Sequence, residues 1–302
     1  MSATLSWLED ALGDRVQGSA DRTSPWNKAT TTFRVDLARL GRVAVQVGRP
    51  EHRERIRRRV SASRFVAAAP RLRVPQVIAD GGDAEVPFVV TRWVEGRPAS
   101  SFLATPAEAN LSMTWLHAVL EELGRLAPAP ADLSTVWCDP ERLHRTAVDW
   151  FDSVVSRLDT RVACVVSDCV DRTRTAFDFE APVFAHGDVV PVNVLIDERG
   201  AVTLLDFEDA RLALPGFDRA MSWTTLALHH PEAAAVFESL MAKPGTATSG
   251  RVDRVGVATM GCLQRLERAS DSLAGLGNET AALGELARVA QVADGLGRRS
   301  SD

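Results

Sequence analysis

Residues 182–211 decide the fold of this chain, and they read PVFAHGDVVPVNVLIDERGAVTLLDFEDAR. Within this stretch two apolar runs, Asn193–Asp197 and Ala201–Phe207, flank the turn-forming residues Glu198–Gly200. Apolar, β-branched runs on both sides of a glycine-containing turn are typical of two antiparallel strands joined by a tight connection. The stretch therefore predicts a β-hairpin whose two outer ends lie side by side.

Three polar side chains fall at that shared end of the hairpin. Asp188 lies in the loop before the first strand, Asn193 begins that strand, and Asp206 ends the second strand. Carboxylate and amide oxygens suit Mg²⁺, which keeps part of its water shell and binds substrate phosphates. A carboxylate in the preceding loop is also placed to accept a proton from an incoming hydroxyl. The alternative is an ordinary hairpin whose carboxylates are solvated.

The spacing His-Gly-Asp, four residues, Asn, an apolar strand and Asp-Phe resembles the aminoglycoside phosphotransferase and choline kinase-like family. The resemblance implies that Asp188 is the catalytic base and that Asn193 and Asp206 hold the metal. It also implies that His186 orients the catalytic loop. Asp218, in a later Gly-Phe-Asp sequence, resembles the family's structural aspartate. We expect Asp218 to act as a helix N-cap or as a brace for the loop.

The resemblance implies an α+β fold of the bilobal protein-kinase type. This fold has a small, mainly antiparallel β-sheet N-lobe and a larger helical C-lobe that contains the catalytic β-hairpin. We expect the N-lobe, on the nucleotide-phosphate side, to span residues 1–91. We expect the C-lobe, with the catalytic loop, metal site and acceptor site, to span residues 92–302 and to end in a disordered tail at 298–302.

Periodicity and capping signals predict the individual elements. A short amphipathic helix is expected near the N-terminus, and Thr105-Pro106 and Asp139-Pro140 are typical starts of helices. Strands are expected at residues 30–36, 42–47, 72–77 and 86–94, and further helices at 51–69, 161–176, 217–228, 232–241, 251–274 and 278–296.

The chain departs from the family pattern where the N-lobe should grip the nucleotide. The strand before Gly48 should carry a lysine or arginine for the α- and β-phosphates, and the aligned residue is Gln46. The following helix should supply a glutamate to pair with that cation, and the aligned residue is Arg59. A glutamine amide offers only a neutral donor, so it cannot replace a cation electrostatically.

Three explanations of this departure are open. In the first, another cation replaces the missing lysine or arginine. The candidates are Lys28, in the loop expected to lie over the nucleotide phosphates, and Arg49, just after the strand that contains Gln46. The phosphate site is rebuilt around Arg59, with Gln46 as its neutral partner. Or the protein is catalytically degenerate and serves as a nucleotide-binding or scaffolding protein. We favour the substitution of another cation. A protein that does not transfer phosphoryl groups has no chemical need for Asp188, Asn193 and Asp206 together at the hairpin.

Two further stretches bear on binding. The segment Arg92–Pro98 resembles the linker between the lobes, which implies that backbone groups near Arg92 and Val94 contact the nucleotide base. The arginine-rich run at 53–64 predicts the solvated face of a helix whose apolar side includes Ile56. The alternative is a basic patch that steers an anionic partner.

Composition excludes several classes of protein. The formal net charge of −5 over 302 residues argues against nucleic-acid binding. The N-terminus lacks the pattern of a signal peptide, and no apolar run approaches the roughly 20 residues of a membrane span. The four cysteines show no zinc-binding spacing. We expect a cytoplasmic protein with neither nucleic-acid nor membrane partners, and its oligomeric state is open.

The reaction implied by the resemblance is transfer of the γ-phosphoryl group of ATP or GTP, with Mg²⁺, to a hydroxyl of a small molecule. The acidic residues Glu208 and Asp209 would attract a cationic acceptor such as an aminoglycoside, or else pair with Arg211 and Arg219. The breadth of the family allows antibiotic resistance, antibiotic biosynthesis, or metabolism of a sugar, amino alcohol or amino acid.

Overall fold

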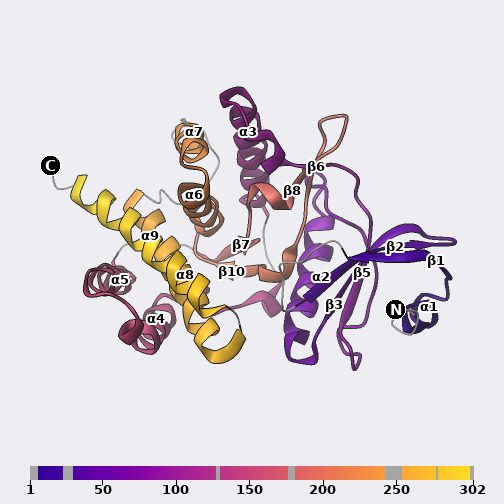
Figure 1. Cartoon of the computed structure of the whole chain (residues 1–302), viewed down its shortest axis with the longest axis horizontal. Helices are drawn as coiled ribbons and strands as arrows, with labels where there is room; N and C mark the ends of the chain where they lie inside the picture. Colours follow the sequence, from indigo (N-terminus) through magenta and orange to yellow (C-terminus); the bar gives the residue numbers. More distant parts are fainter. Residues whose placement is uncertain are drawn as a thin grey trace.

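The structure is a computed structural model that describes residues 6–22, 30–126, 130–175, 181–241, 254–276 and 278–299. A five-stranded sheet forms the N-terminal part, and seven of the described helices form the body that follows. Helix α2 (Arg53–Ala67) lies between the sheet and this body (Figure 1). The chain therefore has the α+β, two-lobed arrangement that the sequence predicts.

The N-lobe sheet is antiparallel, in the order β1-β2-β3-β5-β4. Alternate residues of its strands, including Val35, Val45 and Val90, are buried and pack with Leu8 of α1 (Ser6–Leu12). This alternation follows from the two-residue period of a strand with one buried face. The strands are β1 (Val16–Arg22), β2 (Thr30–Leu37), β3 (Gly41–Gly48), β4 (Val77–Asp80) and β5 (Phe88–Arg92).

One expected strand of the N-lobe begins later than predicted, and one observed strand has no counterpart in the prediction. The strand expected at 72–77 begins only at Val77, because Pro75 has no N–H for a ladder and Arg73 instead forms a parallel bridge to Thr203 of the C-lobe. The edge strand β1 is not predicted, because its sequence VQGSADR lacks an apolar alternation. The division of the chain after residue 91 stays a prediction, and β5 ends at Arg92.

The C-lobe confirms the capping predictions. Thr105 Oγ1 accepts a hydrogen bond from the N–H of Glu108, and the carboxylate of Asp139 accepts one from the N–H of Arg142. Its helices are α3 (Pro106–Leu123), α4 (Pro140–Val154), α5 (Thr160–Arg172), α6 (Phe217–His229), α7 (Pro231–Met241), α8 (Arg254–Asp271) and α9 (Glu279–Arg299). None of the described helices is both long and apolar enough to cross a bilayer. Helix α9 reaches into the segment 298–302, where a disordered tail is expected; residues 300–302 lie outside the described ranges.

Three short strand pairings organise the predicted hairpin. Strand β8 (Val194–Ile196) pairs with β9 (Val202–Leu204), which confirms the hairpin, and β6 (Arg97–Pro98) extends it on the other side. Strand β7 (Val183–Ala185), which leads into the predicted catalytic loop His186–Asp188, pairs with β10 (Arg211–Ala213). Both ends of the stretch from 182 to 211 are therefore tied together.

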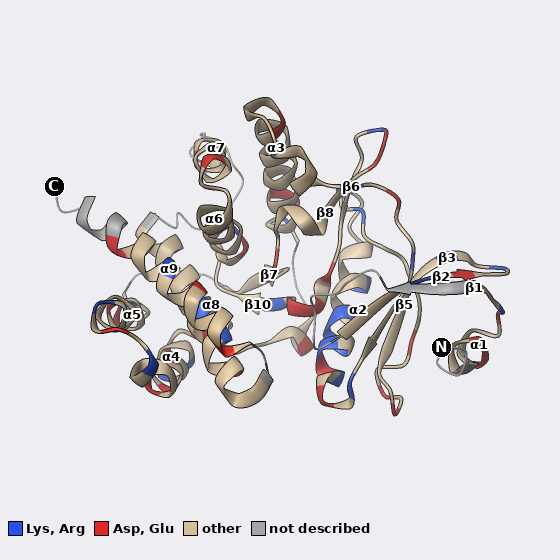
Figure 2. Ribbon diagram, viewed as in Figure 1, with Lys and Arg blue, Asp and Glu red and all other residues tan. Residues whose placement is uncertain are grey.

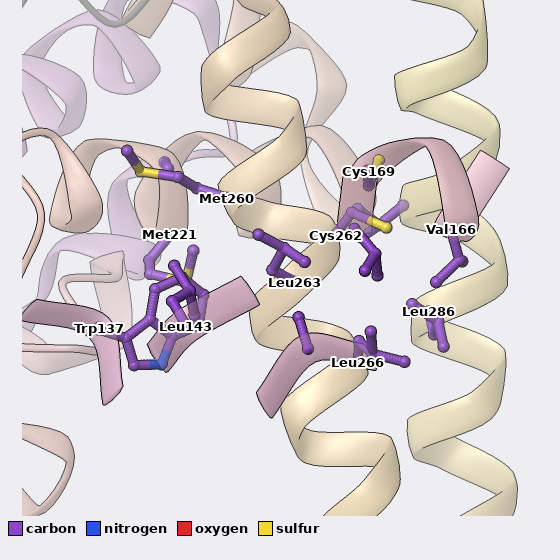
Figure 3. Packing of buried hydrophobic residues seen from close by; sticks show 14 of the residues in the cluster. Trp137, Leu143, Val166, Cys169, Met221, Met260, Cys262, Leu263, Leu266 and Leu286 are labelled. Carbon is purple, nitrogen blue, oxygen red and sulfur yellow. The ribbon is translucent and has the colours of Figure 1, made fainter. Parts of the chain in front are cut away.

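Helix α8 passes through the centre of the larger core. Cys262, Leu263 and Leu266 on α8 are fully buried and belong to one cluster with Val166 of α5 and Leu286 of α9 (Figure 3). Contacts on several sides fix the rotation of α8 about its axis. The polar residues on its remaining face therefore have defined positions toward the catalytic loop.

Gly261 allows the close approach of α8 to α6. A Cβ atom at this position would lie 2.1 Å from Oγ1 of Thr224, so we expect Gly261→Ala to lower the free energy of unfolding by about 1–3 kcal/mol. Gly284 in α9 is exposed and has nothing within 4 Å of such a Cβ, so Gly284→Ala should raise that energy by about 0.5–1 kcal/mol. Urea denaturation measures both; a change of the same sign in both variants would contradict this account.

Candidate active site

The loop from His186 to Asp188 is held by the side chain of Asp218. The two carboxylate oxygens accept hydrogen bonds from the N–H groups of His186 and Gly187, each at 2.8 Å. Burial raises the pKa of the Asp218 carboxyl, and these donors and His186 oppose that shift. The N-cap of α6 is Gly216, so Asp218 is a brace for the loop and not a helix cap.

The imidazole of His186 fixes the loop from the inside. Its Nδ1 accepts a hydrogen bond from the N–H of Asp188 at 3.2 Å, so its Nε2 carries the proton and donates to the carbonyl oxygen of Leu205 at 2.7 Å. His186 is fully buried against Phe207 and has no access to a substrate. His186 therefore joins the loop to the end of β9, and its role as an orienting residue stays a prediction.

Gly187 is required by the close approach of two backbone segments. Its φ is +85°, and a Cβ atom there would lie 2.2 Å from the carbonyl oxygen of Asp209. Only glycine adopts this conformation without cost and leaves room for that oxygen. The catalytic loop therefore lies directly against the segment that follows Asp206.

Asp188 and Asn193 form a hydrogen-bonded pair. Nδ2 of Asn193 donates to Oδ2 of Asp188 at 2.9 Å and to the carbonyl oxygen of Asp188 at 3.0 Å, which turns Oδ1 of Asn193 away from the pair. Burial raises the pKa of the Asp188 carboxyl, although the Arg268 guanidinium 3.8 Å from its Oδ1 acts in the opposite direction. A raised pKa makes this carboxylate a better proton acceptor.

Asp206 has a backbone conformation that few residues adopt. Its φ of 62° is the one positive value at a non-glycine residue in the described ranges, and such outliers concentrate at functional sites. Its Oδ1 accepts a hydrogen bond from Nη1 of Arg59 at 2.7 Å. The N-lobe helix α2 thus reaches the candidate metal ligand directly.

Gln46 occupies the position of the expected phosphate-binding cation, and its neighbours are polar. Its Nε2 donates to Oγ1 of Thr30 at 2.8 Å and to Oε2 of Glu208 at 3.4 Å, while its buried Oε1 has no hydrogen-bond partner among the described atoms. Burial and the nearby Asp206 and Asp209 raise the pKa of Glu208 to about 7. Arg55 lies 3.6 Å from Glu208. The amide of Gln46 therefore stands where a lysine or arginine is expected, and it lies beside the carboxyl group of Glu208.

The arginine run on α2 differs from its prediction. Arg57 and Arg64 are exposed as expected and pair with Asp83 and Asp80. Arg59, by contrast, is only 11% exposed, because this side of α2 packs against the turn Phe207–Asp209. Figure 2 shows blue positions of α2 beside the red segment near β10. The expectation of a wholly solvated face is wrong for this side of the helix.

The acidic residues after β9 do not form the ion pairs that the sequence suggests. Arg211 pairs with Glu267 at 3.0 Å, and Arg219 pairs with Glu121 at 3.0 Å. The predicted ion pairs between the side chains of Glu208 and Asp209 and these two arginines are therefore wrong. Asp209 instead lies 3.5 Å from Arg268, and burial of its carboxyl is outweighed by Arg268 and other arginines, so its pKa is lowered.

The remaining predicted nucleotide contacts are not brought to this centre. Arg49 is exposed and lies 3.8 Å from Glu51. The side chain of Arg92 is exposed and donates to the carbonyl oxygen of Leu40 at 3.3 Å, and Val94 lies half-buried in the linker. Lys28 lies outside the described residues. The role of each of these residues toward a nucleotide stays a prediction.

A cleft of about 1090 Å³ opens beside the catalytic loop, between α2, α8 and α9. Asp188 and Asp206 line it from the hairpin end, and Arg58, Glu267 and Arg268 line it from the helices. The last three were not predicted as site residues. The sequence signal for Arg58 is the arginine-rich run at 53–64, and the signal for Glu267 and Arg268 is their charge beside the buried Leu263 and Leu266 of α8.

The donor atoms at the hairpin end fit Mg²⁺. Oδ1 of Asn193 faces away from Asp188, and Asp206 has a second carboxylate oxygen besides the one bound to Arg59. No group of three or more His, Cys, Asp or Glu side chains in the described chain is arranged to hold a metal. The pair therefore suits an ion that completes its shell with water and nucleotide phosphates, which is the usual mode of Mg²⁺.

Comparison with known proteins agrees with this geometry. The profile of the phosphotransferase enzyme family matches residues 25–255. No match was found among curated proteins.

Solved structures with similar folds include antibiotic phosphotransferases. Macrolide 2'-phosphotransferase type I has a TM-score of 0.69 and 15% identity, with 94% of this chain and 96% of that chain covered. Aminoglycoside-3'-phosphotransferase of type VIII has a TM-score of 0.61 and 24% identity, with 88% and 98% covered. A thermostable mutant of aminoglycoside phosphotransferase APH(4)-Ia, in a ternary complex with ADP and hygromycin B, has a TM-score of 0.64 and 16% identity, with 96% and 98% covered. These similarities confirm the bilobal, kinase-like fold.

Proposed function

Because the chain belongs to the phosphotransferase enzyme family, we propose that it is a small-molecule kinase that transfers the γ-phosphoryl group of ATP or GTP to a hydroxyl group. The observation that carries this proposal is the braced catalytic loop. Asp218, His186 and Asn193 together hold Asp188 by its backbone and its carboxylate. These hydrogen bonds hold the carboxylate of Asp188 in one position at the wall of the cleft, as a general base requires.

The proposed roles follow from the chemistry of each side chain. Asp188 orients the acceptor hydroxyl and takes its proton as the new O–P bond forms. Asn193 and Asp206 would hold Mg²⁺, which neutralises charge on the phosphates when it is bound. With little covalent chemistry for the protein to perform, the residues of the loop contribute mainly by positioning.

Arg59 is the cation that we propose for the missing phosphate clamp. It lies on the N-lobe side of the site, and its guanidinium is within hydrogen-bonding distance of Asp206. In that position it is close to the place where phosphates bound through a metal on Asp206 would lie. Gln46 then acts as a neutral neighbour, which is consistent with its contact to Glu208. A guanidinium suits this task because it binds phosphate oxygens in pairs.

A second candidate function is a catalytically degenerate nucleotide-binding or scaffolding protein. Two contacts favour it: Arg59 already neutralises one oxygen of Asp206, and the carboxyl group of Glu208 stands where the phosphates would require positive charge. In this alternative Arg59 is a permanent substitute for a metal. The two candidates therefore differ in whether a nucleotide binds together with Mg²⁺.

Thermal unfolding in the presence of nucleotides separates these candidates. We expect Mg²⁺ with ATP or GTP to raise the Tm by several degrees, because 100 Kd of ligand adds about 2.7 kcal/mol, and expect a smaller shift without Mg²⁺. Arg59→Gln should weaken nucleotide binding about 10- to 100-fold, since a charge-assisted hydrogen bond contributes about 1.5–3 kcal/mol. Arg64→Gln, an exposed change on the same helix, is the control. A nucleotide response of the wild-type protein that does not depend on Mg²⁺, or no response at all, would favour the degenerate alternative; equal affinity in both variants would assign the clamp to another cation.

A further inference from the structure

Arg58 is a cation that lines the cleft and forms no direct ion pair within the described ranges. It lies on α2, half-buried, between the exposed Arg57 and the paired Arg59. No hydrogen bond or ion pair joins Arg58 to another residue of the described ranges, although its neighbours on the helix all have acidic partners. A guanidinium withdrawn from water normally binds a carboxylate or phosphate, because its five N–H groups otherwise lose their hydrogen bonds.

The charges that face Arg58 make this lack of a partner unfavourable. Burial lowers the pKa of its guanidinium, and the positive charges of Arg211 and Arg55 lower it further, against Asp209 and Glu267. Three guanidinium groups from α2 and β10 therefore share one wall of the cleft. An anion placed among them would relieve this repulsion.

The carboxylates that face Arg58 each form an ion pair with another arginine of the cleft. Glu208 pairs with Arg55, Glu267 with Arg211, and Asp209 with Arg268. Asp271 is the other charged lining residue without a partner in the described chain, and burial, together with Glu267, raises the pKa of its carboxyl and disfavours its anion. Among the arginines that line the cleft in the described chain, Arg58 is the one without an ion pair of its own.

We propose that Arg58 binds an oxyanion of the acceptor, a carboxylate or a phosphate ester, while the acceptor hydroxyl lies at Asp188. The inference rests on the proposed kinase function and names its substrate class. Arg268 links the two positions, because its guanidinium lies 3.8 Å from Asp188 and 3.5 Å from Asp209, which is one of the charges that Arg58 faces. The acceptor is thus a hydroxyl compound with a negative charge, in contrast to the cationic acceptor that the acidic sequence around Glu208 suggests.

The dimensions of the cleft agree with such a molecule. Its volume of about 1090 Å³ is slightly above the roughly 300–1,000 Å³ typical of small-molecule sites, so it has room for such a molecule. Asp188 and Arg58 line the same cavity from opposite lobes, so an acceptor that touches both would also hold the lobes together. Anion binding at Arg58 would then orient the hydroxyl toward its base.

The test uses the full chain saturated with Mg–ADP, so that an anion can respond only at the vacant γ-phosphate position or at Arg58, and the variant Arg58→Gln distinguishes these two positions. Inorganic phosphate and succinate are titrated separately against sodium chloride at constant ionic strength, with Tm as the readout. We expect one or both anions to raise the Tm of the wild-type protein. Arg58→Gln should weaken the apparent affinity for the anion about 10- to 100-fold. The anion with the larger response identifies the phosphate or the carboxylate form of the acceptor.

Arg57→Gln is the matched control, because it removes the adjacent, exposed arginine that pairs with Glu54 and Asp83. It should respond to anions as the wild-type protein does. An unchanged response in Arg58→Gln, or no anion response at all, would overturn the inference. The Tm shift with Mg–ADP itself reports on the kinase proposal, so a protein that binds Mg–ADP but no anion separates the two failures.

Discussion

Replacing Asp188 with asparagine is expected to lower kcat by about 10²- to 10⁴-fold, the usual contribution of a general base. The asparagine has nearly the same shape and keeps an oxygen for the hydrogen bond from Nδ2 of Asn193. It cannot take a proton at neutral pH, so the acceptor hydroxyl stays protonated as it attacks. Because the loop is held through backbone groups by Asp218, the fold and the affinity for Mg–nucleotide should not change.

The measurement is phosphoryl transfer to an acceptor found by screening hydroxyl compounds, with Tm and nucleotide affinity followed in parallel. Glu198→Gln is a suitable control, because Glu198 is an exposed carboxylate at the opposite end of the same hairpin. Wild-type turnover by Asp188→Asn would remove the base from the mechanism. A loss of both activity and Tm would instead indicate a structural role for this carboxylate.

The local part of this architecture is predictable from sequence. The hairpin is confirmed because its apolar runs and its Gly200 turn act over neighbouring residues. The starts of α3 and α4 are confirmed because Thr105 and Asp139 satisfy N–H groups three residues ahead. The strand β1 is missed because an edge strand needs no continuous apolar face.

The contacts between the lobes are not predictable in the same way. Arg59 meets Asp206 across 147 positions of sequence, and the helical pattern of α2 indicates only that the arginine is off the apolar stripe. The same pattern fits solvent, a neighbouring lobe or a ligand. Arg268 is similar: its contact with Asp188 depends on the rotation of α8, which is set by burial of Leu263 and Leu266. Pairing of charges over long separations follows from packing, which a single sequence does not display.

The loop brace gives the second large effect: Asp218→Ala is expected to lower the free energy of unfolding by about 2–6 kcal/mol. Its carboxylate accepts from the N–H groups of His186 and Gly187, and each buried donor left without an acceptor costs about 1–3 kcal/mol. Activity should fall as well, because His186 and Gly187 precede the proposed base directly. Chemical denaturation gives the first quantity, and kcat measured on the protein that remains folded gives the second.

Asp159→Ala isolates the part of this effect that belongs to the loop. Asp159 also accepts a backbone hydrogen bond, from the N–H of Val162 at the start of α5, but it is exposed and remote from Asp188. Its loss should cost about 0.5–2 kcal/mol, as for other N-caps, and leave kcat unchanged. If Asp218→Ala instead matched Asp159→Ala in both stability and kcat, the buried carboxylate would not be what holds the loop in place. The position of Asp188 would then have to come from Asn193 and the imidazole of His186 alone.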